Sequence, residues 1–198
     1  MNKFTLSLAL VSALSFGCSS TSHSDGSAEA SMEEMMAAWQ RAGTTGEEHR
    51  ALDAFVGTWK ATVTMYWSPD APPDVSTGTM TNTWVLDGRH LEQRFEGTAG
   101  GAPFKGVGMW GFDVAAGEYY GTWIDTMTTA VMISSGPRSA DGKTFEMKST
   151  NTDPVTGKRV SSEEVIVIES PSRHTMTSYK LDGGERTKAM EIVYERVL

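Results

Sequence analysis

The sequence predicts an all-β fold, an antiparallel up-and-down barrel of about ten strands preceded by one or two short helices. Two observations lead to this prediction. From residue 57 onward, apolar and polar residues alternate with a period of two, as in strands that are buried on one face. Turn-forming residues recur at intervals of about twelve to sixteen residues, with no helical pattern between them. Because an open meander leaves two exposed edges, we expect the strands to close into a barrel.

Composition limits the classes of function. The chain has 198 residues, 39% hydrophobic and 21% charged, which fits one globular domain with an additional terminal segment. Its 25 acidic and 17 basic residues give a net charge of −8, so binding to nucleic acid or to an anionic membrane surface is not expected. The single cysteine excludes an intramolecular disulfide and a cysteine-based zinc site. We expect no metal and no cofactor, which leaves a small-molecule-binding domain or an enzyme.

The first 17 residues are typical of a signal peptide. Lys3 precedes an apolar run from Phe4 to Phe16, which is shorter than the ~20 residues that a membrane-spanning helix needs. Cleavage would leave Cys18 first, and the stretch from Leu14 to Cys18 resembles a bacterial lipoprotein signal. This resemblance implies an acylated Cys18 and a periplasmic protein of the cell envelope that touches the membrane only through its lipid. Ser19 favours the outer membrane, and residues 18–31 form a Ser-rich tether. Ordinary cleavage beside an incidental thiol is the alternative.

Residues 32–56 are predicted to form the leading helices. Ser31 with Glu34, and Thr45 with Glu48, have the spacing of capping boxes, so helices are expected to start near residues 32 and 46. The first helix carries an apolar stripe at helical spacing, formed by Met32, Met35, Met36 and Trp39. We interpret this stripe as a packing surface, with a partner-binding surface as the alternative.

The barrel domain is predicted over residues 57–198. Asp87 and Gly88 indicate a two-residue hairpin turn, whereas the boundary near Met127 lacks Gly and Pro and is weakly marked. The ten strands are expected near residues 57–67, 79–86, 90–97, 103–113, 118–126, 129–136, 144–152, 158–168, 173–181 and 187–197.

A barrel of ten strands has an interior wider than side chains readily fill, so we expect a cavity. Inward Trp residues could form its walls, and Gly106 and Gly108 leave space beside Trp110. Inward polar residues need hydrogen-bond partners, which a ligand could supply; an internal water network is the alternative. Arg196 is a candidate to cover Trp59 through a cation–π contact. The candidate ligand-binding residues are Trp59, Asn82, Trp84, Gln93, Trp110, Tyr119, Trp123, Asp125 and Tyr194.

Short motifs at both ends of the domain resemble known barrels. Residues 53–60 are similar to the opening strand of the intracellular fatty-acid-binding proteins, and Gly57-Thr58-Trp59 also resembles the lipocalin signature. Residues 193–196 are similar to the end of the fatty-acid-binding proteins. These resemblances imply a calycin barrel in which the first and last strands are neighbours. Ile192 stands where those proteins have the Arg that holds the fatty-acid carboxylate.

A longer resemblance extends over residues 47–196. The stretches 49–59, 70–73, 87–89, 103–106, 121–125, 153–158 and 190–192 are similar, in order, to the bacterial family called domain of unknown function 1579. The resemblance implies a lipocalin-like barrel and no defined chemistry.

Three hypotheses about function follow from the sequence. The first is an exported, lipid-anchored barrel that binds a small, mainly apolar ligand. The second is an enzyme on the same barrel that uses Asp125 or His174 for proton transfer, although no residue is assigned as catalytic. A lone His174 could also ligate haem, but a solvated or hydrogen-bonded His is the stronger interpretation. The third is an envelope interaction module whose partner protein is unidentified and would bind the helix at 32–39.

Overall fold

The structure, a computed structural model, describes residues 30–68 and 70–198. The predicted signal peptide at 1–17, the candidate lipidation site Cys18 and nearly all of the tether at 18–31 lie outside the described residues. None of the helices in the described part is both long and apolar enough to cross a membrane.

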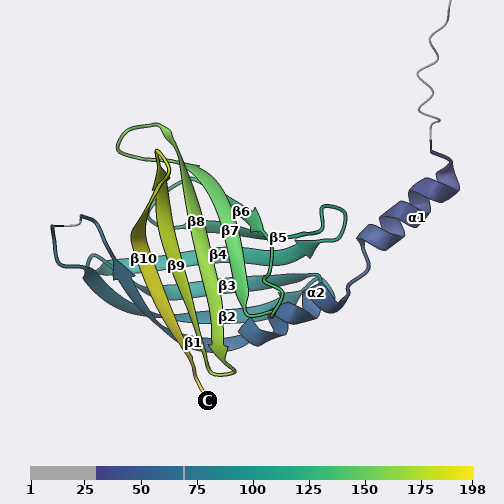
Figure 1. Ribbon diagram of the computed structural model, residues 1–198. Helices are drawn as coiled ribbons and strands as arrows, with labels where there is room; N and C mark the ends of the chain where they lie inside the picture. Colours follow the sequence, from purple (N-terminus) through teal and green to yellow (C-terminus); the bar gives the residue numbers. More distant parts are fainter. Residues whose placement is uncertain (1–29, 69) are drawn as a thin grey trace, which may run out of the picture.

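Ten antiparallel strands close into a barrel, as predicted (Figure 1). Each strand pairs with the next along the chain, and β10 pairs with β1 to complete the ring. The strands are β1 (Gly57–Met65), β2 (Asp74–Val85), β3 (His90–Ala99), β4 (Ala102–Asp113), β5 (Glu118–Asp125), β6 (Met132–Gly136), β7 (Thr144–Thr152), β8 (Arg159–Ser170), β9 (Arg173–Asp182) and β10 (Glu185–Arg196).

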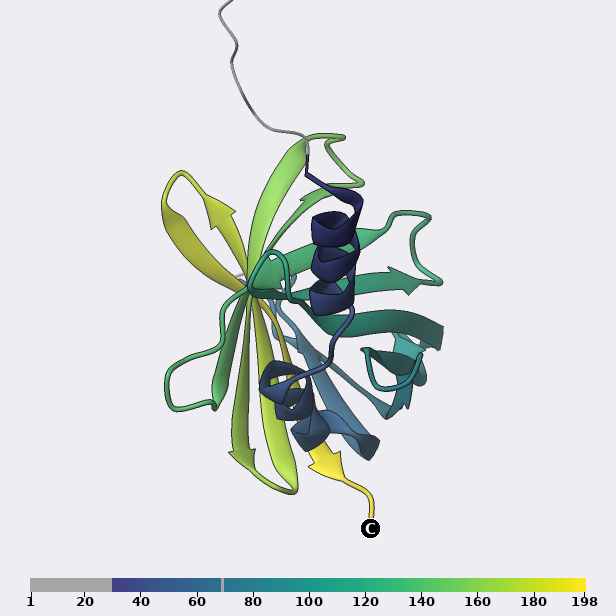
Figure 2. The ribbon, with the colours of Figure 1, turned by 90° about the vertical axis from the view of Figure 1, so that its right-hand side faces the viewer.

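The two ends of the barrel differ. At one end, which we call the closed end, the helix α2 (Glu47–Arg50) and the 3-10 helix η1 (Ala51–Phe55) lie across the strands (Figure 2). The η1 side chains Leu52 and Phe55 are 0% and 2% exposed because they insert among the strands. The other end, the mouth, is formed by the five connections from β1 to β2, β3 to β4, β5 to β6, β7 to β8 and β9 to β10. The helices therefore plug one end and leave the mouth uncovered.

The first helix does not pack on the barrel, which differs from our interpretation of its apolar stripe. Helix α1 (Met32–Ala42) begins at the predicted capping box of Ser31 and Glu34, but none of its residues is buried. Figure 1 shows it standing away from the strands. Met32, Met36 and Trp39 are 70%, 62% and 72% exposed. Amphipathic spacing predicted the helix correctly, but it does not specify which surface the apolar side meets.

Three local features also differ from the prediction. Helix α2 is capped at Gly46 rather than Thr45, and the ring Nδ1 of His49 accepts a hydrogen bond from the Gly46 amide at 3.2 Å. The β2–β3 turn spans the four residues 86–89, with positive φ at Leu86, Asp87 and Gly88. Strand β6 is short, and within the described chain it pairs with β7 at only two register positions. We call this weakly paired boundary the β6–β7 seam.

Candidate functional site

Strand register defines which side chains point into the barrel. Trp59 lies opposite Met80, and Asn82 lies opposite Gln93, so alternate residues of each strand face inward around the ring. The closed end is filled by side chains from η1 and four strands. This buried cluster consists of Leu52, Phe55, Leu91, Tyr119, Phe145, Met147 and Ile166.

Nearer the mouth a second buried cluster, which includes Met80, Phe95 and Ile192, fills part of the interior, and Trp123 and Met176 pack against it. Gln93, Trp123, Met176 and Ser178 all face inward by register, yet each is partly exposed. An inward side chain in a filled barrel would be inaccessible, so solvent reaches this part of the interior. We call the space between the level of Ile166 and the mouth the upper lumen.

Inward-facing glycines allow the aromatic side chains to lie along the barrel wall. A Cβ at Gly106 would lie 2.1 Å from the Trp123 ring, and one at Gly108 would lie 3.0 Å from the same ring. A Cβ at Gly121 would lie 2.8 Å from the indole nitrogen of Trp110. The two rings therefore occupy the space that side chains on β4 and β5 would need. Trp123 therefore forms an aromatic surface on one side of the upper lumen, whereas Trp110 packs against Phe55 and Phe145 at the closed end.

Three of the predicted site residues are tied to the closed end. The Trp59 indole N–H donates to the Phe55 carbonyl at 2.8 Å, and the Trp84 indole N–H donates to Asp53 at 2.7 Å. The Tyr119 hydroxyl bonds to Glu48 of α2. These polar groups position the helices against the barrel, and the side chains lie below the upper lumen.

The predicted amide pair is brought together by β2 and β3. Asn82 is 1% exposed, and its Nδ2 donates to the Phe55 carbonyl at 2.8 Å. Its Oδ1 is buried and has no hydrogen-bond partner in the described structure. Gln93 lies opposite it in register and is more accessible. The pair thus joins the closed-end plug to the base of the upper lumen.

Asp125 lies at the mouth, where it shapes the β5–β6 loop. Its Oδ2 accepts the Trp123 indole N–H at 3.1 Å, and its Oδ1 accepts the amides of Met127 and Thr128 at 2.9 and 3.1 Å. The carboxylate therefore fixes the orientation of Trp123 and the start of the loop. Asp–backbone bonds of this kind also explain why a boundary without Gly or Pro can turn.

His174 and Tyr194 form an inward aromatic pair near the closed end. Their rings stack with centroids 4.4 Å apart, and the His174 ring meets Trp59 edge-on at 4.3 Å. Burial lowers the pKa of His174 to about 3, so the imidazole is neutral near pH 7. Burial, with the nearby Glu164, raises the pKa of Tyr194. The imidazole thus behaves as an aromatic packing group.

Polar side chains line the part of the interior that follows the aromatic surface around the ring. They come from the four consecutive strands β6 to β9, and the Oγ of Ser149 and the Oδ1 of Asn151 are buried without a partner in the described structure. We call this surface the polar wall. Its members are Ser134, Ser149, Asn151, Ser162, Glu164 and Ser178.

Glu164 is the residue of the polar wall that sequence reasoning missed. It lies opposite Met147 of β7 and Ser178 of β9, and it is 9% exposed. Burial alone raises its pKa to about 7. In the sequence, the face of β8 that carries Glu164 also carries Val160 and Ile166, but Val165 places an apolar residue on the other face as well. The alternation therefore could not decide which face of β8 is inside.

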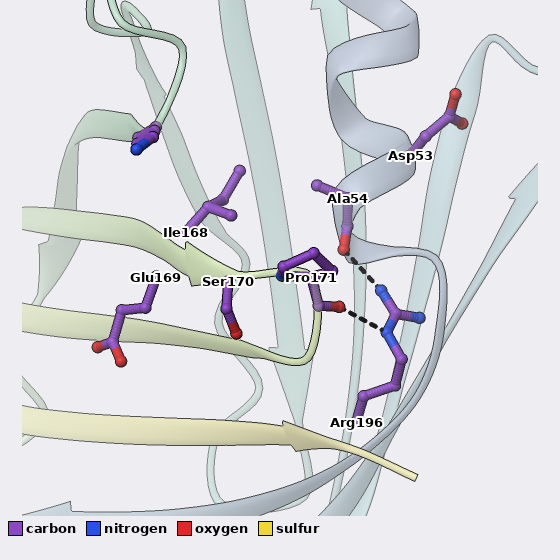
Figure 3. A pocket seen from close by; sticks show the side chains of 8 residues that line it. Asp53, Ala54, Ile168, Glu169, Ser170, Pro171 and Arg196 are labelled. Atoms are coloured by element: carbon purple, nitrogen blue, oxygen red, sulfur yellow. Dashed lines mark hydrogen bonds between the residues drawn. The ribbon is translucent and has the colours of Figure 1, made fainter. Parts of the chain in front are cut away.

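A surface pocket of about 580 Å³ lies at the closed end (Figure 3). The Arg196 side chain enters it and donates to the carbonyls of Ala54 at 3.0 Å and Pro171 at 2.8 Å. Its guanidinium also lies 4.1 Å from the centre of the Trp59 ring, which confirms the predicted cation–π contact. Because the Arg196 guanidinium already binds these carbonyls, the polar groups of the pocket hold η1 and the end of β10 together and leave few hydrogen-bonding groups for a ligand.

A second cleft, about 340 Å³, follows the β6–β7 seam. Outward Val131 and Ile133 line it on one side, and Lys148 and Arg159 line it on the other. The inward-facing Ser134 also contributes, so the cleft lies where the wall between solvent and lumen is least paired. In the described residues, no group of three His, Cys, Asp or Glu side chains is arranged to hold a metal ion.

Comparisons with known proteins agree with this architecture. Residues 44–196 match the family described as "Protein of unknown function (DUF1579)". Rv2717c from M. tuberculosis has a similar structure, with a TM-score of 0.58 and 16% identity over 78% of this chain and 100% of that chain. The S-type phycobiliprotein lyase CPES from Guillardia theta is similar with a TM-score of 0.52 and 16% identity over 78% of this chain and 99% of that chain. No match is found among curated proteins. At this identity the two structures show a shared fold.

Proposed function

The chain belongs to the DUF1579 family of proteins of unknown function, and from its own barrel we propose that it binds a small, mainly apolar ligand in the upper lumen. The observation that carries this proposal is the polar wall, in which the buried oxygen atoms of Ser149 and Asn151 lack partners and which lies near partly exposed inward side chains. Buried polar groups are normally hydrogen-bonded, so a ligand that completes them is favoured.

The two sides of the lumen suit different parts of such a ligand. Trp123 offers apolar area beside the backbone of Gly106 and Gly108, and an aromatic side chain can bury ~150 to 250 Å². Ser162 and Ser178 offer hydroxyls that donate or accept on the opposite side. The ligand is therefore mainly apolar, with its polar group directed toward β8 and β9.

Binding can be tested with a variant that fills the lumen. Ser178→Phe places a ring in the upper lumen, and Thr177→Phe places the same ring on the outer face of the same strand. We expect the wild type and Thr177→Phe to bind the apolar fluorophore N-phenyl-1-naphthylamine, and Ser178→Phe to lose at least tenfold in affinity. Native mass spectrometry before and after organic extraction would show any ligand retained from the cell.

Circular dichroism would establish that both variants fold. Equal probe binding by the folded Ser178→Phe variant would contradict a binding site in the upper lumen.

We also propose that the protein is exported and anchored by acylated Cys18 on the periplasmic side of the cell envelope, with the outer membrane favoured. The motif at 14–18 and the Ser-rich tether support this location. Mass spectrometry of the N-terminal peptide should detect diacylglycerol on Cys18, and Cys18→Ala should move the protein from the membrane to the soluble fraction. An uncleaved N-terminus or an unmodified Cys18 would contradict it.

A further inference from the structure

We infer that the ligand carries a protonated amine that pairs with the Glu164 carboxylate, with its apolar body against the aromatic surface. This inference rests on the proposed function and names the class of ligand. It makes Glu164 the recognition group of the lumen.

The placement of Glu164 leaves its carboxyl without a partner in the described part of the protein. The side chain faces the lumen between Met147 and Ser178, is 9% exposed, and receives no hydrogen bond or ion pair within the described structure. A buried carboxylate without a partner is strongly unfavourable. Its neighbours on the same face of β8, Ile166 and Ile168, are apolar, so an apolar residue could occupy this position without that cost. A carboxyl at position 164 is therefore better explained by ligand binding than by the stability of the barrel.

In the described barrel, no cationic side chain pairs with Glu164. The guanidinium of Arg196 lies at the closed end, where it covers Trp59 and binds three backbone carbonyls. Tyr194, His174 and Asp125 also face inward, and none of them is cationic near pH 7. Lys180 shares the inward register of Ser178, but it is exposed near the mouth, and burial is the only cause that shifts the pKa of Glu164. A cation that pairs with ionised Glu164 would therefore come from the ligand.

The surroundings of Glu164 fit an ammonium group. Ser178 lies beside it on β9 and Ser162 lies two residues along β8, so their hydroxyls can accept the remaining N–H donors. The aromatic faces across the lumen favour a cation as well as apolar area. An anionic ligand would meet the same carboxyl and be repelled. Ile192, at the position where the fatty-acid-binding proteins have their carboxylate-binding Arg, agrees with a preference against fatty acids.

Three naphthalene probes of nearly equal shape test the preference. They are 1-naphthylmethylamine, 1-naphthalenemethanol and 1-naphthoic acid, which carry a cation, a neutral hydroxyl and an anion. For the wild type at pH 7.5, we expect calorimetry to give a dissociation constant for the amine at least tenfold below that of the alcohol, with the acid weakest.

Two variants locate the origin of the preference. Glu164→Gln keeps the shape of the side chain and should bring the amine and the alcohol to within about twofold. Glu163→Gln is the matched control, because Glu163 points outward and pairs with Arg186 at 3.2 Å. It should leave the preference intact.

A measurement on the wild type provides a test that needs no variant. Near pH 6 the carboxyl is largely protonated, so pairing with an ammonium must release a proton. Calorimetry in two buffers of different ionisation enthalpy should detect this release for the amine and not for the alcohol.

The outcomes separate the two proposals. If none of the probes binds to the wild type, the proposed binding function fails. If the probes bind equally, if Glu164→Gln keeps the amine preference, or if no proton is released, the barrel still binds ligands but the pairing with Glu164 is wrong.

Discussion

Glu164 and His174 are buried, face the interior and titrate between pH 3 and 7, and burial favours the neutral form of both. The pKa of Glu164 rises to about 7 and that of His174 falls to about 3. Their effects on stability have opposite signs. Glu164 keeps its proton in the folded state when the unfolded chain has lost it, so stability falls as pH rises from about 4.5 to 7. His174 stays neutral when the unfolded chain takes up a proton, so stability falls as pH drops from about 6.5 to 3.

Glu164→Gln should stabilise the ligand-free protein at alkaline pH. The pKa of Glu164 lies about 2.5 above its ordinary value of 4.5, which corresponds to on the order of 3 kcal/mol above pH 7. Urea denaturation followed by circular dichroism should show this gain at pH 8 and little difference from the wild type at pH 4. An equal gain at both pH values would mean that ionisation of Glu164 is not the cause.

His174→Phe should remove a loss of stability on the acid side. Below pH 6.5 a neutral buried His contributes a loss of about 1.4 kcal/mol per pH unit, which the substitution eliminates. The slope of unfolding free energy between pH 6 and 4 is the quantity to compare, because the slope is independent of packing changes at the aromatic pair. Identical slopes for wild type and variant would show that His174 titrates normally.

At the scale of elements, the helices before the barrel differ in what they contribute. The η1 side chain of Leu52 is 0% exposed inside the closed end, whereas Trp39 of α1 is 72% exposed. Burial, rather than hydrophobicity alone, decides which of them stabilises the fold.

Leu52→Ala and Trp39→Ala should therefore have very different effects. Removing the buried Leu52 side chain leaves a cavity and is expected to lower the free energy of unfolding by about 2 to 5 kcal/mol. Trp39→Ala should change it by less than about 0.5 kcal/mol. Thermal unfolding followed by circular dichroism checks both values. A large loss in Trp39→Ala would show that α1 packs on the barrel in solution.

The β6–β7 seam should be the first part of the barrel to open. Seven register pairs join β1 to β10, but two join β6 to β7. Fewer interstrand hydrogen bonds lower the free energy of local opening. Hydrogen–deuterium exchange should be fastest, among the strands, in residues 132–136. Protection of β6 equal to that of β1 would contradict a weak seam.

The sequence predicted most elements because each depends on local chemistry. Period-two alternation located β1 and β3, and the capping box located α1 at its observed start. The sequence did not predict where β6 begins or how little of it pairs with β7, since this pairing is set by residues distant in the chain. For the candidate site, it placed the aromatic and amide residues of β2 to β5 on the inward face, because one face of these strands is clearly apolar. It missed Glu164 because β8 is apolar on both faces.

At the scale of the whole molecule, the β1–β10 pairing holds the fold together. Seven register positions link these strands, and Arg196 adds bonds to the carbonyls of Ala54 and Val56. Without β10, the edges of β1 and β9 would be exposed, and exposed edges invite aggregation. Closure makes stability a property of the complete ring.

Truncation after Asp182 should therefore abolish folding rather than weaken it. The shortened chain lacks all of β10 and leaves two unpaired edges. Size-exclusion chromatography should show aggregates, and circular dichroism should show no cooperative thermal transition. A soluble monomer with a cooperative transition would contradict the need for closure.

An antiparallel ring with an even number of strands brings its first and last residues to the same rim. Here both the helices that precede Gly57 and the C-terminal residue Leu198 leave from the closed end, away from the mouth. A fluorescent reporter fused behind Leu198 would leave entry of small molecules unobstructed, whereas an insertion between Gly183 and Gly184 would overhang the entrance. The barrel is thus suited to conversion into a sensor whose optical module and binding chamber occupy opposite poles.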